Sequence, residues 1–249
     1  MKSYFKFLRR NKAYTIIDVL GLALSMMFII IIGAYTWQET HLDTQHTKAD
    51  RMYVVGIDWE GDRVTTGSHW RMIRRLMDRF PEIESGTALV ASSRTLDKTN
   101  GEPVVTEAMF VDSTFFNIFD FELLRGNKNT VLASPNSVVI TENYARRIWG
   151  DEDPMGKTLV FNVNEDPVTV GGIMAPLSNT SLRAQNRSKP IDMLIPFENI
   201  KHMNSSMHDE RMGNATGAEI ILLAKEGYDL SANEQQYTDF AKDLSLIHI

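Results

Sequence analysis

The densest group of side chains that could bind a metal lies between residues 202 and 212. It contains two imidazoles and three thioethers, from His202, Met203, Met207, His208 and Met212. Imidazole nitrogen and thioether sulfur are ligands that suit Cu(I). The residues between them are ordinary loop residues, and the chain has 13 methionines in all. A solvated loop is therefore the favoured interpretation, and we predict no metal site here.

The other histidines and the short sequence motifs do not indicate catalysis. His41 and His46 flank Asp43 just after an apolar run, where we expect solvated polar side chains. The sequence has no GxSxG, no HExxH and no Walker A lysine loop. Gly171-Gly172 leads to a proline instead of a dinucleotide-binding helix, so it predicts a turn or a bulge. We predict no catalytic, cofactor-binding or metal-ligating residue, no cofactor and no enzyme.

The element around which the chain is organised is the uncharged apolar run from Val19 to Trp37. As a helix, these nineteen residues would span roughly 28 Å, close to the roughly 30 Å hydrocarbon core of a bilayer. The run is longer than the apolar core of a cleaved signal peptide. We therefore predict a transmembrane helix over residues 15–38 that acts as an uncleaved signal anchor.

The residues that flank this run predict its orientation. Residues 1–14 form a basic leader with five Lys or Arg and no acid. After the run, the acidic residues Glu39, Asp43 and Asp50 are accompanied by a single lysine, Lys48. The positive-inside rule then places the N-terminus in the cytoplasm and the rest of the chain outside it. The aromatic and basic residues of the leader also suit contact with membrane lipid at the inner interface.

Composition limits what the remaining chain can be. Of the 249 residues 43% are hydrophobic and 23% are charged, which is typical of a folded domain. The net charge is −6, and because the leader holds five positive charges, the rest of the chain carries −11. Such an acidic domain argues against nucleic acid as a partner. There is no cysteine, which excludes disulfides and thiolate metal sites.

The residue patterns predict an α+β domain in which strands outnumber helices. Helices are expected at 68–80, where Ser68 is the expected N-cap and Pro81 the stop, at 113–119, at 142–149 with Thr141 as the N-cap, and from Ser231 onward. Exposed loops are expected at 178–189 and 201–217. Strands are expected at 51–59, 87–90, 104–111, 138–141, 158–163, 168–173, 193–196 and 218–224.

Several stretches, taken in order, resemble one family of membrane proteins. They are a basic leader and first span at Tyr4–Ala23, an alanine-aspartate-arginine signature at Thr47–Val54, and a long run at Phe110–Lys157 with a double phenylalanine and an Asp-Pro-x-Gly-Lys turn. VTVGGI and NTSL continue the match after residue 167. Together they are similar to the MacB and FtsX-like permease subunits of ABC transporters. We expect the aromatic residues of the run to form one core cluster: Phe110, Phe115, Phe116, Phe119 and Phe121.

The resemblance implies an architecture and a function. It implies a periplasmic core domain at 41–243 made of two subdomains, with the second inserted at about 92–217. It also implies a permease that forms a homodimer or a heterodimer, works with a cytoplasmic ATPase and contacts a periplasmic partner. Such proteins lie in the bacterial inner membrane and transmit ATP-driven motion to the periplasm for export or envelope regulation.

The end of the sequence departs from this family. The family has three further spans after the core domain, and they are absent here. The last six residues, LSLIHI at 244–249, resemble the translation of a sequencing adapter, so we expect a non-native tail on a C-terminally truncated fragment. The alternative is a single-pass envelope protein whose ectodomain binds a ligand or a partner.

Overall fold

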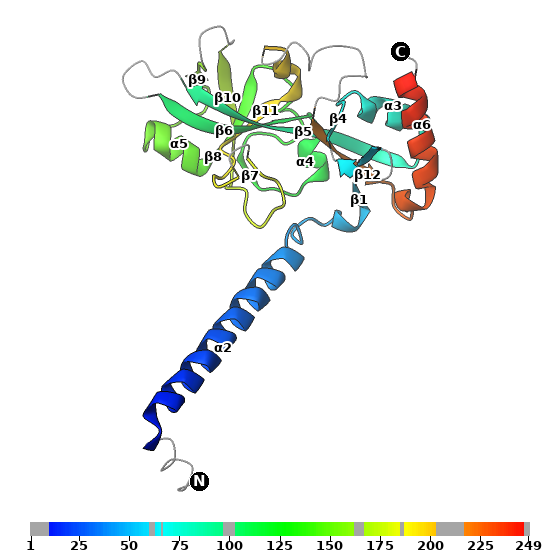
Figure 1. Cartoon of the computed structure of the whole chain (residues 1–249). Helices are drawn as coiled ribbons and strands as arrows, with labels where there is room; N and C mark the ends of the chain where they lie inside the picture. The colour runs from blue at the N-terminus through cyan, green and yellow to red at the C-terminus, as the bar shows by residue number, and fades with distance from the viewer. Residues whose placement is uncertain are drawn as a thin grey trace. The chain divides into compact units, whose positions relative to one another are not determined.

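The computed structural model describes residues 10–59, 63–65, 67–96, 103–161, 167–184, 187–202 and 217–246. The chain divides into two compact units, Met1–Thr44 and Gln45–Ile249. The described part of the first unit is dominated by the long helix α2 (Lys12–Thr40). The second unit contains the sheets and the remaining helices, and we call it the core domain (Figure 1).

Helix α2 has the length and composition of a membrane span. Its most apolar stretch has a mean hydropathy of 2.5, and none of that stretch is buried. At about 1.5 Å per residue its 29 residues reach roughly 44 Å, more than the hydrocarbon core requires. Ser25 and Thr40 donate hydrogen bonds to the carbonyl oxygens of Gly21 and Thr36 within the helix. The predicted span at 15–38 lies inside this helix. Among the described residues it is the one helix that meets these criteria.

A mixed ten-stranded sheet forms the centre of the core domain (Figure 1). The main order of its strands is β1 (Met52–Val54), β12 (Ala218–Ala224), β5 (Ile83–Leu96), β6 (Val104–Val111), β11 (Met193–Pro196), β8 (Ser137–Thr141), β10 (Val168–Met174) and β7 (Leu123–Arg125). Most neighbouring strands are antiparallel, but β6 pairs with β11 and β8 with β10 in parallel. The short strands β4 (Gly67–Ser68) and β9 (Thr158–Leu159) pair with β12 and β10. Strands β2 (Ile57–Trp59) and β3 (Arg63–Thr65) form a separate two-stranded sheet.

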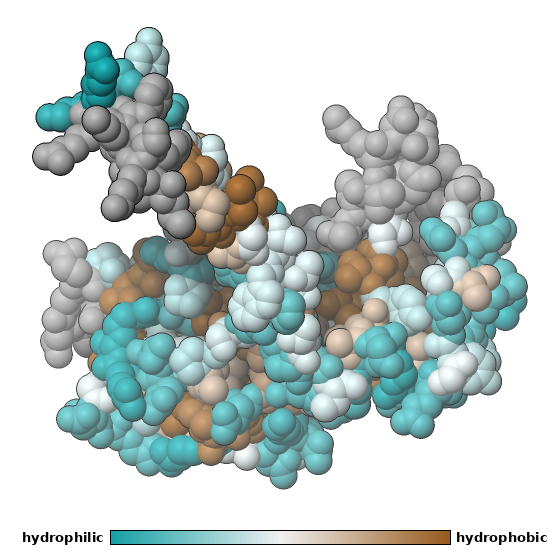
Figure 2. Space-filling view, turned by 90° about the horizontal axis from the view of Figure 1, so that it is seen from below, coloured by the Kyte–Doolittle hydropathy of each residue, from teal (hydrophilic) through white to brown (hydrophobic). Residues whose placement is uncertain are grey.

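The two faces of this sheet are covered by different elements. Side chains alternate between the faces of a strand, so Ala88 and Val90 of β5 enter one core and Leu89 enters the other. Helices α3 (Met72–Arg79), α5 (Glu142–Trp149) and α6 (Glu234–Leu246) cover the first core. Helix α4 (Phe115–Ile118) and the chain around it cover the second. Both faces of the sheet are thereby buried. The surface seen in Figure 2 has hydrophilic residues interspersed with hydrophobic patches.

The predicted α+β class is confirmed. The bounds of β6, β11, β12 and α5 agree with those expected from the sequence. Thr141 caps α5 as predicted, because its Oγ1 accepts a hydrogen bond from the backbone N–H of Tyr144 at 3.2 Å. Acidic Glu142 in the first turn of α5 also suits the positive end of the helix dipole.

Other element predictions were wrong in their details. Helix α3 begins at Met72, because Gly67 and Ser68 form β4, paired with β12. The single strand expected at 51–59 is two strands, β1 and β2, separated by Val55 and Gly56. Strand β5 has 14 residues where four were expected, and α4 is shorter than predicted. Strand β7 occupies residues for which no strand was expected.

Three predictions stay predictions: those for the inserted subdomain, for the Met and His cluster and for the C-terminal tail. Strand β5 continues through Ser92, and the inserted subdomain at about 92–217 stays an expectation. The Met and His cluster falls almost wholly in 203–216, outside the described residues. Helix α6 ends at Leu246, and the rest of the suspected tail is likewise outside them.

Candidate functional site

The chain enters the core domain through residues Gln45–Arg51, which we call the junction segment. His46 in this segment is only 4% exposed. Its Nδ1 accepts a hydrogen bond from the backbone N–H of Asp120 at 3.0 Å. The ring lies edge-on to Phe119 and Phe121, at centroid distances of 5.2 and 4.8 Å. The prediction of a solvated His46 was therefore wrong, because aromatic rings and a backbone donor enclose it.

The carboxylate of Asp120 fixes the next residue of the junction segment. Its Oδ2 accepts from the backbone N–H of Thr47 at 2.7 Å and from the Thr47 hydroxyl at 2.8 Å. Burial alone would raise the pKa of Asp120, but the hydrogen bonds from Thr47, together with neighbouring positive charge, hold this pKa below its usual range. Lys48 donates to the carbonyl oxygen of Asn117 at 2.6 Å. The junction segment is thus docked on α4 and the chain that follows it.

Arg51 ends the junction segment and binds two other strands. Its Nη1 donates to Oε2 of Glu84 and to the carbonyl oxygen of Ala224, both at 2.8 Å. The Arg51 side chain is 17% exposed, so these charge-assisted bonds are partly shielded from water. Strand β1 follows at once and pairs antiparallel with β12, with Met52 opposite Leu223.

The chain leaving β12 is fastened at the same end of the sheet. The hydroxyl of Tyr53 donates to Oδ1 of Asp229 at 3.0 Å. Asp229 also caps the short helix η3 (Leu230–Asn233), and hydrogen bonds from Ser231 and then Tyr53 lower the pKa of this carboxyl group. In α6, the hydroxyl of Tyr237 donates to Glu82 at 2.8 Å. The incoming and outgoing segments of the core domain are therefore joined to each other and to β5.

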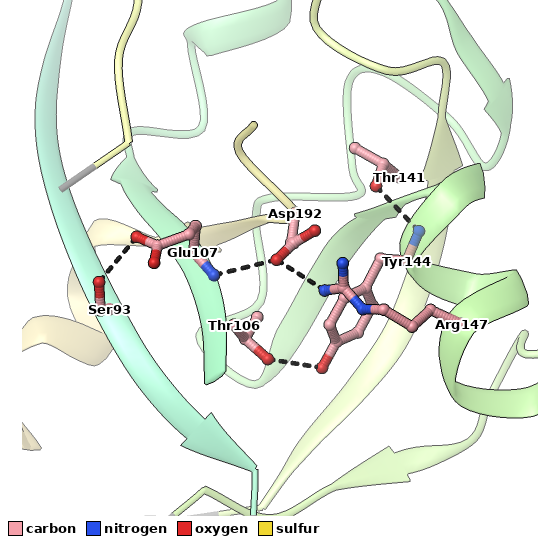
Figure 3. Close-up of polar contacts among 7 residues, drawn as sticks. All are labelled: Ser93, Thr106, Glu107, Thr141, Tyr144, Arg147 and Asp192. Carbon is pink, nitrogen blue, oxygen red and sulfur yellow. Dashed lines mark hydrogen bonds and ion pairs between the residues drawn. The ribbon is translucent and has the colours of Figure 1, made fainter. Parts of the chain in front are cut away.

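A second polar cluster lies farther along the sheet (Figure 3). Asp192, which is 4% exposed, accepts at Oδ2 from the backbone N–H of Glu107 at 3.1 Å and from Nη2 of Arg147 at 2.8 Å. Its own backbone N–H donates to the carbonyl oxygen of Glu107, and its carbonyl accepts from Thr141. One aspartate thus connects β6 and β8 with α5 at the start of β11.

The remaining contacts of this cluster are also between elements. Glu107 is 1% exposed and accepts from the hydroxyl of Ser93 on β5 at 2.7 Å. The hydroxyls of Tyr144 and Thr106 are 2.9 Å apart, and burial raises the pKa of Tyr144 to about 12. A phenol with this pKa stays protonated and serves as a hydrogen-bonding group. The contacts in Figure 3 hold strands and helix together, and we assign the cluster a structural role.

The predicted site residues and aromatic cluster can be compared with this geometry. Within the described residues, no group of three His, Cys, Asp or Glu side chains is arranged to hold a metal ion. Phe115, Phe116, Phe119 and Phe121 pack in the second core, as expected. Phe110 lies in the first core instead, with Arg94 5.5 Å from its ring centroid, because neighbouring strand residues face opposite sides.

The glycine pair shows that a local prediction was right. The pairing of β10 with β8 shifts register between Val170 and Gly172, which is the predicted bulge. A Cβ at Gly171 would lie 2.0 Å from Oγ of Ser137, and one at Gly172 would lie 2.7 Å from Cγ2 of Val131. These positions serve close packing of the sheet.

The core domain has a fold that is also seen in solved domains of permeases and transporters. A domain of a putative permease from Porphyromonas gingivalis superposes with a TM-score of 0.64 at 19% identity, covering 80% of this chain and 86% of that one. The periplasmic region of MacB from Actinobacillus actinomycetemcomitans gives 0.56 at 18%, covering 83% and 86%. The extracellular domain of YknZ, a noncanonic ABC-type transporter from Gram-positive bacteria, gives 0.53 at 15%, covering 77% and 91%.

The chain belongs to the MacB-like periplasmic core domain family, whose model matches residues 15–240. The expected family resemblance is therefore confirmed. The macrolide export ATP-binding/permease protein MacB of Neisseria meningitidis is 25% identical over 164 residues, which cover 64% of this chain and 23% of that protein. Its Neisseria gonorrhoeae counterpart is 27% identical over 124 residues, covering 48% and 18%. The chain thus spans about a quarter or less of the length of these relatives.

Proposed function

We propose that this chain is the N-terminal anchor and periplasmic domain of an ABC permease subunit that converts movement in the membrane into movement of its core domain. In this proposal α2 spans the bacterial inner membrane with its N-terminus in the cytoplasm. The subunit dimerises with itself or a second permease, and a separate cytoplasmic ATPase supplies the motion. The work is mechanical, so the chain itself is not an enzyme.

The observation that carries the proposal is the joined pair of chain segments at one end of the sheet. Arg51 binds Ala224 and Glu84, and Tyr53 binds Asp229. Each such hydrogen bond contributes about 0.5–1.5 kcal/mol, or about 1.5–3 kcal/mol when one partner is charged. In this proposal, a displacement of α2 reaches the sheet through the junction segment, because these hydrogen bonds hold the segment to the sheet.

Strand β5 gives this displacement a long path through the domain. It carries Glu84 at the junction and Ser93 in the polar cluster of Figure 3. Nine residues of strand at about 3.3 Å each span roughly 30 Å. Export of a cargo, or regulation of an envelope enzyme, is the output that such a moving domain would serve. The export of macrolides is part of the name of the relatives and is not assigned to this chain.

The location and the partner can be tested together in native membranes. The chain has no cysteine, so Ser3→Cys and Lys128→Cys each give a single labelling site. We expect a membrane-impermeant maleimide to label Lys128→Cys in cells with a permeabilised outer membrane, and Ser3→Cys only after lysis. A tagged chain expressed from its own locus should co-purify with a P-loop ATPase after cross-linking.

Each outcome has a separate meaning. Labelling in the reverse order contradicts the proposed orientation. Correct labelling without any ATPase contradicts the transporter role and favours the alternative, a single-pass envelope protein with a binding ectodomain.

A further inference from the structure

A cavity of about 550 Å³ opens beside the junction segment, within the core domain. Polar side chains from four separate stretches of the chain line it. Lys48 comes from the junction segment and Glu84 from the start of β5, while Asn117 and Asp120 come from α4 and the chain after it. Lys128 and Asn129 belong to the loop after β7. The cavity thus presents two ammonium groups and two carboxylates.

Each of the two carboxylates accepts hydrogen bonds from the protein through only one of its two oxygens. Glu84 binds Arg51 through Oε2, and Asp120 binds Thr47 through Oδ2. The other oxygen of each carboxylate has no hydrogen bond within the described part of the chain. These two oxygens are therefore available as acceptors to a ligand that carries N–H groups.

The two lysines have donors to spare as well. Lys48 uses one of its three N–H donors on the carbonyl oxygen of Asn117. Lys128 makes no hydrogen bond or ion pair to any residue that the structure describes, although it lines the cavity. The side-chain amides of Asn117 and Asn129 add uncharged donors and acceptors to the same wall.

This charge pattern selects a class of ligand. A purely anionic ligand would meet both carboxylates, and a purely cationic ligand would meet both lysines. A zwitterion with a phosphate at one end and a primary ammonium at the other can pair with both sets of groups. Phosphate oxygens accept charge-assisted bonds from lysine, and the ammonium donates to the carboxylates. We propose that this cavity binds a phosphoethanolamine group.

Two sources can supply this group, a phospholipid headgroup or a soluble phosphoethanolamine ester. Lys48 follows the last residue of α2 by eight positions, so the chain limits its distance from the end of that helix to about 29 Å. This bound permits a lipid headgroup as the source, and the second experiment below distinguishes it from a soluble ester. The lipid source rests on the proposed function to the extent that α2 is in a membrane, whereas the chemistry of the cavity does not depend on an ATPase.

The first experiment titrates soluble esters into the purified full chain in detergent and follows binding by calorimetry. We expect glycerophosphoethanolamine to bind, and glycerophosphocholine to bind at least tenfold more weakly because its quaternary ammonium has no N–H to donate. Lys128→Gln should weaken binding of the ethanolamine ester at least tenfold. Lys189→Gln is the matched control, because Lys189 is exposed and does not line the cavity.

The second experiment identifies the source by placing the full chain in lipid nanodiscs. Slower amide hydrogen exchange over residues 117–129 in phosphatidylethanolamine than in phosphatidylcholine would assign the site to the lipid. Binding of the soluble ester without this protection supports the site and assigns it to the soluble source. The proposal is overturned by absence of both signals, or by equal binding to wild type and Lys128→Gln while circular dichroism shows that both are folded. All of these readouts use the purified chain, so failure to find an ATPase would leave them unchanged.

Discussion

The guanidinium of Arg51 donates to the backbone carbonyl of Ala224 at 2.8 Å, although the two residues are 173 positions apart. Arg51 is the last residue before β1, and Ala224 is the last residue of β12. This contact therefore binds the beginning of the core domain's sheet to the segment that leads away from it.

Replacement of Arg51 should destabilise the core domain. We expect Arg51→Gln to lower the free energy of unfolding by about 1.5–3 kcal/mol, because two charge-assisted hydrogen bonds are lost. Thermal or denaturant unfolding of the full chain would measure the loss. Arg146→Gln is the control, since Arg146 forms an exposed pair with Glu142 on α5 worth only about 0.3–0.5 kcal/mol. Equal losses for the two variants would argue against a special role for Arg51.

His46 should be important to stability despite its polar sequence context. We expect His46→Ala to cost about 2–4 kcal/mol, because it removes a buried ring and leaves the N–H of Asp120 without its acceptor. His41→Ala should cost less than about 0.5 kcal/mol, since His41 is exposed. Chemical denaturation of both variants would compare them, and a small effect at His46 would contradict the buried geometry.

Stability should fall between pH 4 and pH 6 through Asp112. Burial, assisted by the negative charge of Glu198, raises the pKa of Asp112 to about 6, from 3.8. The folded protein therefore retains this proton to higher pH than the unfolded chain. Its stabilising effect is complete below pH 4 and is lost as the pH rises through 6, by at most about 3 kcal/mol.

Asp112→Asn provides the test of that pH dependence. The amide oxygen can still accept from the N–H of Ala88, which Asp112 binds at 2.7 Å, but it does not titrate. Denaturant unfolding at a series of pH values should show a flatter profile for the variant. Identical profiles would show that other groups are responsible.

Asp192 should be the most sensitive position of the cluster in Figure 3. We expect Asp192→Ala to cost about 1–3 kcal/mol, because the buried N–H of Glu107 loses its acceptor. The guanidinium of Arg147 also loses its partner, but its side chain is 47% exposed and can bind water instead. Asp153→Ala is a matched control, since its pair with Arg125 is exposed and is worth about 0–1 kcal/mol. Hydrogen exchange should show faster opening of β6 and β11 in Asp192→Ala only, and uniform exchange would contradict this prediction.

The sequence predicted best those elements whose pattern is local. Strands β11 and β12 are short, mostly apolar runs that contribute to the two cores, and α5 carries its own N-cap at Thr141. Ser68 was misread as a cap because its strand pairing with Ala218 is about 150 residues distant. Pairing between strands so far apart in the sequence leaves no signal in the residues next to Ser68.

The contacts of the junction segment could not be predicted from the sequence, for the same reason. His46 lies in a polar stretch after an apolar run, and its partners Phe119, Asp120 and Phe121 are more than 70 residues away. The family resemblance singled out both the stretch that begins at Thr47 and the run that contains Asp120, but did not indicate that they touch. Covariation between His46 and Asp120 among relatives would be a suitable signal.

The antiparallel pairing of β1 with β12 sets how the core domain responds to mechanical load. The N-terminal end of β1 and the C-terminal end of β12 lie at the same edge of the ladder, and hydrogen bonds in such a ladder run across the strands. Forces that separate these two ends break the rungs one at a time, as in unzipping, at low force. Forces that pull both ends in the same direction leave the ladder unloaded and carry the whole domain. The domain is thus stiff toward concerted pulling and weak toward divergent pulling.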